Sequence, residues 1–328
     1  MIDKTILVVQ GASGLSDVPG LAAIADKAEI RFATDKNSLH SSLSGADVLF
    51  GWDFRADDLE ACWHAADSLK WIHWGGAGVD AALFPDLVGS DVTLTNSRGV
   101  FDQAMAEWTL GVMIAHAKRL PETLMFQQQR EWNYRQSTQM LGQKVAVVGV
   151  GSIGRAVARI VTAFGMDIVG VGRSARDNDP DFGHIHAQNE LNTVLADADY
   201  VVLITPLTAE TRNLFDAGRF AAMKPGAMFI NIGRGQLADE TALIGALESG
   251  QIGCAALDVF CEEPLNENNP LWSAPNIIIS PHMSGDFLGH YEVMADLFFN
   301  NFARYQAGET LLNVVDKTRG FVPSVSSA

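Results

Sequence analysis

The chain reads Lys144-Val145-Ala146-Val147-Val148-Gly149-Val150-Gly151-Ser152-Ile153-Gly154 at the point that decides its fold, and a helical run from Arg155 to Phe164 follows. Glycines at these places permit a tight turn, close approach of backbone to a pyrophosphate, and close packing of helix on strand. This strand, turn and helix predict dinucleotide binding rather than a merely structural glycine turn. The candidate binding residues here are Gly149, Gly151, Ser152, Ile153 and Gly154.

The residues about 20 positions further on choose between the two nicotinamide cofactors. NAD-binding versions of this turn place an acid there, which accepts hydrogen bonds from the ribose hydroxyls. This chain reads Gly172-Arg173-Ser174-Ala175-Arg176 instead. A guanidinium and a hydroxyl suit the 2′-phosphate of NADP, because arginine pairs bidentately with phosphate. We therefore expect NADP, held by Arg173 and Ser174. NAD stays open as the alternative, since two arginines on an exposed loop could also be plain surface residues.

Apolar runs on both sides of this turn extend the pattern into a sheet. The glycine motif follows the first of six predicted strands, which are Lys144 to Val148, Asp167 to Val171, Tyr200 to Ile204, Met228 to Ile232, Gly253 to Leu257 and Asn276 to Ile279. Helical stretches lie between them, as in a doubly wound parallel sheet.

The first hundred residues repeat the alternation on a smaller scale. Strands are expected at Ile6 to Val9, Val48 to Phe50, Leu69 to Trp74 and Val92 to Asn96, and helices at Leu21 to Ala28 and Leu59 to Ala66. A helix from Gln103 to Leu120, apolar nearly all round, is expected to be buried, to join the two parts and to pack on a second subunit, with Pro121 following its end.

A chain of 328 residues is too long for one ordinary core. The fold class expected is α/β with two doubly wound parallel-sheet domains, a Rossmann dinucleotide-binding domain and a smaller flavodoxin-like substrate domain. A helix from Tyr291 to Gln306 can return to the first part, which makes that domain discontinuous. The boundaries expected are 1–100 plus 285–328 for the substrate domain and 101–284 for the dinucleotide-binding domain, with a cleft between them.

Composition limits the partners and the setting. The formal net charge of −16 repels phosphate backbones, so nucleic acid is a poor partner. Apolar runs stay shorter than a bilayer span and the N-terminus lacks a signal-peptide pattern, so we expect a cytoplasmic protein without membrane contact. Cys62, Cys254 and Cys261 are interpreted as small apolar filler. His184 and His186 are expected on a surface loop, with no metal bound.

Three segments follow the last strands of the larger sheet, where ligands of open α/β sheets bind. They are Asn231-Ile232-Gly233-Arg234-Gly235, then Leu257-Asp258-Val259-Phe260-Cys261-Glu262-Glu263-Pro264-Leu265, then Ser280-Pro281-His282-Met283-Ser284-Gly285. Together with Gly75 to Asp80, the glycine turn and Met223-Lys224-Pro225-Gly226, they make the chain resemble the D-isomer-specific 2-hydroxyacid dehydrogenase family from about residue 45 to about residue 315.

The resemblance implies catalytic roles for Arg234, Glu263 and His282. Reduction of a 2-keto acid needs a cation that holds the carboxylate and polarises the carbonyl, which Arg234 can supply. It also needs a proton donor for the oxygen that becomes negative as hydride arrives at C2, which His282 can supply. A carboxylate beside the imidazole orients the ring and favours its protonated form, and the family's spacing selects Glu263 over Glu262 for this task.

The same resemblance implies the remaining binding residues. Asp258 corresponds to the acid that holds the nicotinamide carboxamide, although it could merely cap its turn. Thr205, Pro206 and Ile232 complete the candidate cofactor residues. Gly76, Ala77 and Gly78 correspond to a loop whose backbone N–H groups bind the substrate carboxylate, and Arg234 faces the same group. Trp52 stands near a pocket position of relatives, and is equally plausible as core.

The expected activity is hydride transfer between NADP(H) and a small 2-keto acid/D-2-hydroxy acid pair, in the manner of a glyoxylate/hydroxypyruvate reductase and in a homodimer. Met283-Ser284-Gly285 departs from the small glycine-rich or Ala-Thr run of many relatives, which leaves the substrate pocket open. One alternative is a non-enzymatic, dinucleotide-sensing corepressor on the same fold. Another is a formate dehydrogenase, which Glu263 disfavours because those relatives carry glutamine there.

Overall fold

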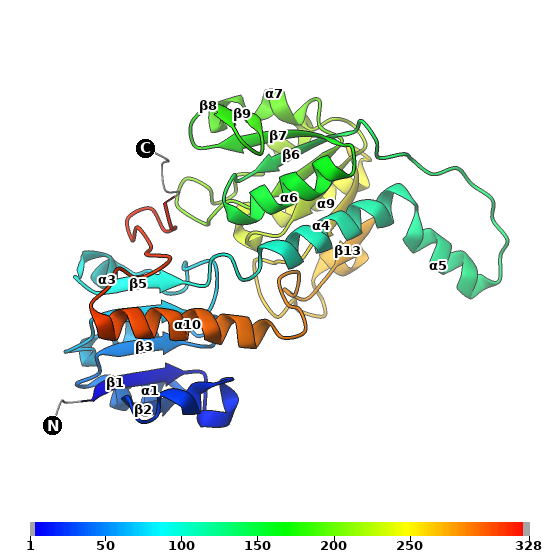
Figure 1. The fold of residues 1–328 in the computed structure, drawn as a ribbon. Coiled ribbons are helices and arrows are strands. Elements are labelled where there is room, and N and C mark those ends of the chain that lie inside the picture. The colour runs from blue at the N-terminus through cyan, green and yellow to red at the C-terminus, as the bar shows by residue number, and fades with distance from the viewer. Residues whose placement is uncertain (1–3, 324–328) are drawn as a thin grey trace. The chain divides into compact units, whose positions relative to one another are not determined.

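The computed structural model describes residues 4–323 and divides the chain into two compact units. One unit, here called unit 1, ends at Phe101 and resumes at Phe287, and the other, unit 2, runs Asp102–Asp286 (Figure 1). Each unit is built on a parallel sheet, so the predicted fold class is confirmed. Within the described residues, none of the helices is both long and apolar enough to cross a membrane.

Unit 2 contains an eight-stranded sheet in the order β13-β12-β11-β10-β6-β7-β9-β8. Its strands are β6 (Lys144–Val148), β7 (Asp167–Gly172), β8 (Arg176–Asp179), β9 (Gly183–Ala187), β10 (Tyr200–Leu203), β11 (Ala227–Asn231), β12 (Ile252–Leu257) and β13 (Ile277–Ile279). All neighbours pair in parallel except β8, which runs antiparallel to β9 at the edge. The six predicted strands are confirmed. The β8–β9 hairpin was not predicted. His184 and His186 lie on strand β9, so the prediction that they lie on a loop is wrong.

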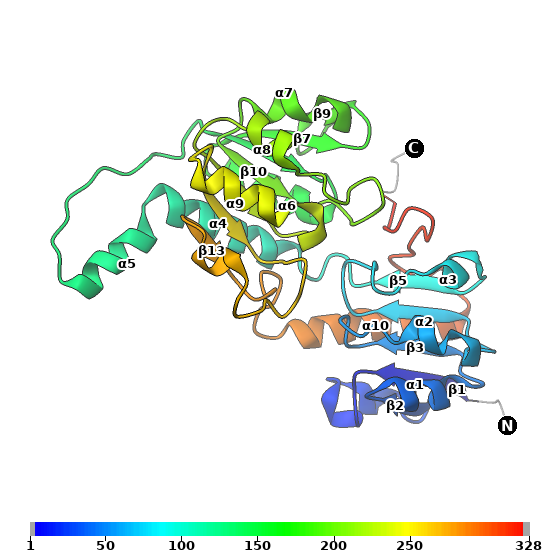
Figure 2. The same cartoon turned by 180° about the vertical axis from the view of Figure 1, so that it is seen from behind.

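Helices cover both faces of this sheet. One face packs against α4 (Asp102–Ala117) and α6 (Ser152–Ala163), which share a buried cluster with the strands. The other packs against α7 (Leu191–Leu195), α8 (Ala217–Ala222) and α9 (Glu240–Glu248). Figures 1 and 2 show these two layers from opposite sides. Short 3-10 turns complete the unit at Gln188–Glu190, Gly235–Leu237 and Pro270–Ser273.

The predicted helix from Gln103 to Leu120 is wrong at its end. Helix α4 stops at Ala117, and a second helix, α5, spans Leu120–Gln129. Between them Arg119 adopts a left-handed backbone (φ 52°), and Pro121 lies in the first turn of α5. Proline is tolerated in the first turn because the backbone N–H groups there have no acceptor within the helix. Pro121 therefore begins a helix rather than marking the end of one.

Unit 1 contains a five-stranded parallel sheet in the order β2-β1-β3-β4-β5, which is the flavodoxin-like order. The strands are β1 (Thr5–Gln10), β2 (Ala28–Ala33), β3 (Val48–Gly51), β4 (Trp71–Trp74) and β5 (Thr93–Asn96). The helix predicted from Leu21 to Ala28 is wrong. A short 3-10 turn, Leu21–Ile24, occupies its start, and strand β2 begins at Ala28. Another 3-10 turn spans Leu15–Asp17.

The C-terminal helix α10 (His290–Ala307) packs on this sheet, as the sequence predicted. Phe298 of α10 stacks on Phe50 with ring centroids 4.0 Å apart and on Trp71 at 5.5 Å. The opposite face carries α1 (Lys36–Leu43) and α2 (Leu59–Cys62), the latter extended by a 3-10 turn at Trp63–Ala65 (Figure 2). A short helix, α3 (Pro85–Gly89), precedes β5.

The cysteines divide into two kinds. Cys62 and Cys254 are buried, in agreement with the apolar role predicted for them, whereas Cys261 is exposed in the loop after β12. The interpretation as filler is therefore wrong for Cys261.

Candidate functional site

The glycine turn connects β6 to α6, and two of its glycines are demanded by their surroundings. A Cβ atom on Gly149 would lie 2.5 Å from the Ile204 carbonyl oxygen, and its φ is +118°. A Cβ atom on Gly154 would lie 2.0 Å from the Gly149 carbonyl oxygen. A Cβ atom on Gly151 would meet no described atom within 4 Å. Open space beside Gly151 at the start of a helix is what close approach of a phosphate requires.

The first turn of α6 is oriented for an anion. Its N-cap residue is Gly151. A glycine has no side chain that could accept hydrogen bonds from the N–H groups of the first turn. The Ser152 hydroxyl donates to a carboxylate oxygen of Asp102 on α4, 3.2 Å away. The turn reads Ser152-Ile153-Gly154-Arg155, and the Arg155 side chain pairs with Asp179 and Asp181. The N–H groups and the positive end of the helix dipole favour negative charge at this place.

Arg173 and Ser174 lie in a bend directly after β7, and both are exposed. Positive charge from Arg173 contributes to lowering the pKa of Glu210, although hydrogen bonds from the Thr208 hydroxyl and from a backbone N–H lower it more. Glu210 belongs to the loop after β10, which begins at Ile204 and includes Thr205 and Pro206. The Thr205 hydroxyl oxygen is buried without a hydrogen-bond partner among the described residues. A buried polar atom of this kind is expected to find a partner in a bound ligand or water.

Arg234 follows β11 in a loop that Asn231 holds from both sides. The Asn231 amide donates to the Arg234 carbonyl oxygen (2.9 Å) and accepts from the backbone N–H of Gly233 (3.1 Å). A Cβ atom on Gly235 would lie 1.8 Å from the Phe260 carbonyl carbon. The glycine thus lets the arginine loop contact the loop that carries Glu263. Ile232, in contrast, is 2% exposed and belongs to the core, so only its backbone can face a ligand.

Glu263 joins the β12 loop to the histidine. Its Oε1 atom accepts the backbone N–H of Phe260 (2.9 Å), and its Oε2 atom lies 2.7 Å from His282 Nδ1. Burial raises the pKa of Glu263, but these two hydrogen bonds and the charges of His282 and Arg234 outweigh burial and bring the pKa below its usual value. Glu263 is therefore ionised across the neutral range.

His282 itself has an unusual backbone. Its φ is +53°, a left-handed conformation that residues other than glycine rarely adopt. Such strain persists only where the surroundings hold it, and it concentrates at functional sites. Here Asp258 provides the hold. The Asp258 carboxylate is 1% exposed and accepts the N–H groups of Met283 and Ser284, both at 2.9 Å, as well as the Ser280 hydroxyl.

Asp258 thus positions the histidine loop, which is close to the capping role weighed from the sequence. Ser280 and Ser284 were not singled out from the sequence, since serine after a strand end carries no pattern of its own. The Ser284 hydroxyl is buried and, like that of Thr205, has no partner among residues 4–323. Unsatisfied hydroxyls were therefore the features of this site that only the structure could show.

The remaining candidate residues lie in unit 1. Gly76, Ala77 and Gly78 follow β4, where the Gly76 carbonyl accepts the N–H of Ser97 (3.0 Å) and the Ala77 carbonyl accepts the Asn96 amide. Trp52 follows β3 and is 9% exposed. Its ring packs on Phe50 and on Tyr291, with centroids 5.4 and 5.3 Å away. Trp52 is thus largely core, which was one of the two alternatives.

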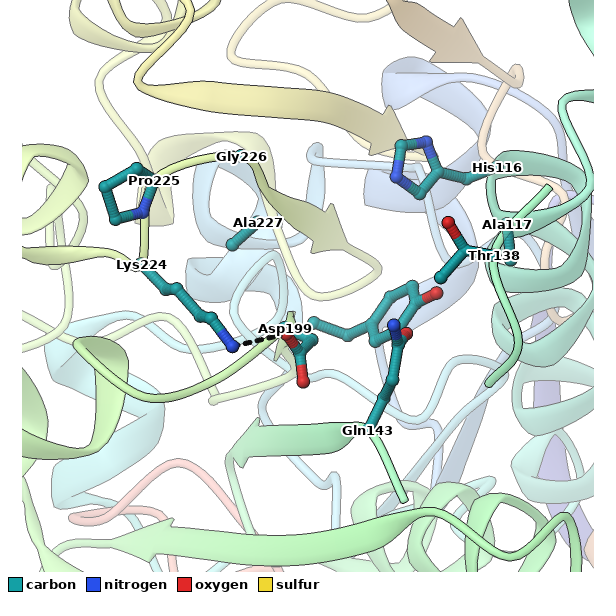
Figure 3. A pocket seen from close by; sticks show the side chains of 10 residues that line it. His116, Ala117, Thr138, Gln143, Asp199, Lys224, Pro225, Gly226 and Ala227 are labelled. Carbon is teal, nitrogen blue, oxygen red and sulfur yellow. Dashed lines mark hydrogen bonds and ion pairs between the residues drawn. The ribbon is translucent and has the colours of Figure 1, made fainter. Parts of the chain in front are cut away.

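Two other features stand apart from the strand-end loops. His184 Nδ1 lies 2.7 Å from Asp177 on the β8–β9 hairpin, and no group of three or more metal-ligating side chains is placed to hold a metal within the described chain. A pocket of about 140 Å³ opens at the opposite, amino edge of the sheet (Figure 3). Its Lys224 and Asp199 pair at 2.7 Å, and Asp199 also accepts the backbone N–H of Lys144. These charges hold strand ends together.

Comparison with known proteins points to one family. Residues 110–284 match the family model described as D-isomer specific 2-hydroxyacid dehydrogenase, NAD binding domain. The chain is 33% identical over 262 residues to a glyoxylate reductase of Thermococcus onnurineus, covering 76% of this chain and 78% of that protein. It is 30% identical to D-3-phosphoglycerate dehydrogenase of Methanocaldococcus jannaschii over 88% of this chain, but spans only 55% of that longer protein.

Among solved structures, the chain is similar to an NADPH-dependent glyoxylate/hydroxypyruvate reductase from Sinorhizobium meliloti, crystallised with NADP and sulfate. The two share 29% identity and a TM-score of 0.84, and the match covers 97% of this chain and 100% of the other.

Proposed function

Because this chain belongs to the D-isomer-specific 2-hydroxyacid dehydrogenase family, we propose that it reduces a small 2-keto acid to the D-2-hydroxy acid with NADPH. The observation that carries this proposal is the contact of 2.7 Å between His282 Nδ1 and Glu263 Oε2. An ionised carboxylate beside Nδ1 favours the imidazolium form, in which Nε2 is a proton donor. A proton donor is what an oxygen receiving charge from hydride addition needs.

His282 donates its Nε2 proton to the carbonyl oxygen as the C2 carbon gains a hydride, so the C=O bond becomes C–O–H. NADPH supplies that hydride when bound. Glu263 stabilises the imidazolium before transfer and fixes the plane of the ring. Asp258 keeps the histidine loop in its left-handed conformation through the N–H groups of Met283 and Ser284. In the oxidation direction the neutral ring takes the proton back.

Arg234 binds the substrate carboxylate and polarises the carbonyl. Its charge lies close enough to Glu263 to contribute to lowering the pKa of that carboxyl group. A guanidinium is suited to this work because its planar donors match a carboxylate bidentately. Asn231 holds the backbone of the arginine loop, and the Arg234 guanidinium donates to the Gly233 carbonyl oxygen at 2.8 Å. For unit 1 by itself, we propose that the backbone N–H groups of Gly76, Ala77 and Gly78 bind a carboxylate.

The residues fit a dinucleotide phosphate. Gly151 leaves space at the N-terminus of α6, and the buried Thr205 and Ser284 hydroxyls have partners to gain from a ligand. Arg173 and Ser174 follow β7, and we propose that they hold the 2′-phosphate; Thr205 and Pro206 follow β10, on the other side of β6. Asp258 accepts three hydrogen bonds and keeps one acceptor position, which we propose for the nicotinamide carboxamide. We therefore propose NADP(H) as the preferred cofactor, with NAD(H) bound more weakly.

Initial rates with glyoxylate, hydroxypyruvate, pyruvate and bulkier branched and aromatic 2-keto acids, each with NADPH and NADH, test the proposal. We expect the highest kcat/KM for glyoxylate or hydroxypyruvate with NADPH. A preference for bulky keto acids would contradict the proposed substrate, and a preference for NADH the proposed cofactor. Tight cofactor binding without turnover of any keto acid would indicate the non-enzymatic sensor instead.

We also propose that the chain forms a homodimer through the arm that contains α5 and the extended segment after it, residues 120–141. This arm projects from the sheet of its own unit (Figures 1 and 2). No residue of α5 is buried, and in the segment after it Trp132 and Tyr134 are 100% and 88% exposed. Large apolar side chains gathered on a projecting segment are typical of a contact surface. A second copy of the chain is the partner proposed for it.

A further inference from the structure

The β8–β9 hairpin forms the outer edge of the sheet in unit 2, and Arg173 and Ser174 lie at its base. Strand β9 pairs with β7 at three positions, whereas β8 pairs with β9 only at Arg176↔Ile185 and Asp179↔Gly183. An edge strand with so few ladder pairs is weakly held by its backbone. Side chains must therefore fix β8 and the bend that leads into it.

Ion pairs with helix α6 provide that hold. The two terminal nitrogens of Arg155 contact the two carboxylate oxygens of Asp179 at 2.8 and 2.7 Å, and one of them also contacts Asp181 at 2.7 Å. Arg159, one turn later, contacts Asp181 at 2.7 Å. Arg176 of β8 adds a longer contact to Asp179, at 3.2 Å.

This cluster is more than a surface network. The Asp179 and Asp181 side chains are only 3% and 8% exposed, and that of Arg155 is 19% exposed. Buried carboxylates are tolerated only when they are paired, and removing one partner of a buried pair leaves a costly charge behind. Hydrogen bonds from Arg155 hold the pKa of Asp179 far below its usual value, so the pair is ionised at neutral pH.

Packing joins the same elements. Asp179 accepts the backbone N–H groups of Asp181 and Phe182, which closes the turn of the hairpin. The Arg155 guanidinium lies 5.8 Å from the centre of the Phe182 ring. That ring fills the space left by Gly170 on β7, where a Cβ atom would come within 2.8 Å of it. The hairpin is thus fixed to β7 and to α6 together.

Arg155 directly follows Gly154, the last glycine of the cofactor turn. We propose that Arg155 and Asp179 are positioning residues that fix the Arg173-Ser174 bend relative to the glycine turn, and thereby set the preference for a 2′-phosphate. This inference rests on the proposed use of NADP(H). The pyrophosphate and the 2′-phosphate are joined through one ribose, which limits their separation, so their binding groups must keep a matching spacing. A ligand without the 2′-phosphate does not need that spacing.

Competition experiments with two adenosine nucleotides isolate this contact. Adenosine 2′,5′-bisphosphate carries the 2′-phosphate, and 5′-AMP does not. In Asp179→Asn we expect the inhibition constant of the bisphosphate to rise about tenfold, the effect of one weakened charged hydrogen bond, while that of 5′-AMP stays within about twofold. Arg155→Lys keeps the positive charge but loses the two parallel hydrogen bonds to Asp179. The inhibition constant of the bisphosphate should therefore rise less in this variant. Arg119→Gln, which removes an exposed arginine paired with Glu122 outside this cluster, is the matched control and should change neither constant.

The outcomes separate this inference from the proposed function. Equal changes for both nucleotides, or none in Asp179→Asn, would overturn the positioning role while leaving the proposed cofactor intact. Unfolding of both Asp179→Asn and Arg155→Lys, seen by circular dichroism, would assign the pair to the fold alone and also overturn it. An unmodified enzyme that binds both nucleotides equally would contradict the NADP preference itself, and the inference would fall with it.

Discussion

His282 Nδ1 and Glu263 Oε2 lie 2.7 Å apart, and the other oxygen of Glu263 accepts the backbone N–H of Phe260. The glutamate is therefore held by its own loop before it meets the imidazole. This arrangement makes the histidine a proton donor whose orientation does not depend on the substrate, and it leads to the first two predictions.

Replacing His282 with alanine should lower kcat for keto-acid reduction by about 10²–10⁴-fold, the usual contribution of a general acid. The Kd of NADPH, measured by fluorescence titration, should stay within about twofold because the ring acts on the substrate oxygen. His64→Ala, an exposed histidine of unit 1, should change neither quantity. Loss of NADPH affinity in His282→Ala would show a structural role and contradict the assignment.

Exchanging Glu263 for glutamine should move the alkaline limb of kcat/KM for reduction to lower pH. The pKa of Glu263 lies below its usual value, so its charge is present throughout the neutral range and favours imidazolium there. Glutamine keeps the size and removes the charge, so activity near neutral pH should fall more than activity in mild acid. Oxidation of the D-hydroxy acid needs the neutral ring, so its acidic limb should also move to lower pH. An unshifted profile, with the shift found in Glu262→Gln, would transfer the role to the adjacent glutamate.

Replacing Arg173 with alanine should raise the KM of NADPH by about 10–100-fold, the range expected for loss of a charged hydrogen bond to phosphate. The KM of NADH should stay nearly constant, since NADH carries no group at that position. Arg319→Ala removes one arginine from the other unit and serves as the control. Equal use of NADPH and NADH by the unmodified enzyme would contradict the prediction.

Two glycines of one motif should fail in different ways when replaced by alanine. Gly154→Ala places a Cβ atom 2.0 Å from the Gly149 carbonyl oxygen, so it should reduce the free energy of unfolding by about 1–3 kcal/mol. Gly151→Ala meets no described atom within 4 Å, so its Tm should be unchanged while the Kd of NADPH rises. Thermal unfolding and cofactor titration of both variants check this. A Tm loss in Gly151→Ala comparable to that of Gly154→Ala would argue against open space for a phosphate.

The double variant Trp132→Ser/Tyr134→Ser should be a monomer at micromolar concentration in sedimentation velocity, whereas the unmodified chain sediments as a dimer. These two side chains are the most exposed large aromatic residues of the arm. Trp272→Ser, which changes another exposed tryptophan of unit 2, should leave the dimer intact. A monomeric unmodified chain would contradict the proposed assembly.

Most of the strands that the sequence predicted consist mainly of apolar residues, although β5, which reads Thr-Leu-Thr-Asn, does not. Strands such as β6 and β10 are buried on both faces, and a continuous apolar run reports this directly. The missed strands lack that signal. β8 reads Arg-Asp-Asn-Asp and depends on Arg155 from another element, and β2 places charged Glu29 and Arg31 among its apolar residues. Helix α5 was missed because a helix that buries nothing in its own chain shows no apolar face.

The candidate site shows a similar division. Motif order predicted that Arg234, Glu263 and His282 follow neighbouring strands, and parallel topology brings such strand ends to one edge. Sequence could not show that the Asp258 carboxylate is engaged by the histidine loop, because those N–H groups come from residues 25 and 26 positions away. Nor could it show that the Thr205 and Ser284 hydroxyls are unsatisfied, which depends on what surrounds them in space.

Glu263 faces two partners at once, and this restricts which side chains can occupy its position. A carboxylate offers an acceptor in both directions, so it can receive the Phe260 N–H and a hydrogen on His282 Nδ1 together. An amide offers one acceptor and one donor. If glutamine keeps the Phe260 bond, its NH₂ group faces Nδ1, which must then carry no hydrogen. A neutral ring then carries its hydrogen on Nε2, and a protonated ring has no acceptor for its Nδ1 hydrogen. Position 263 therefore selects between a ring held as a proton-releasing imidazolium and a ring that favours the neutral Nε2–H tautomer.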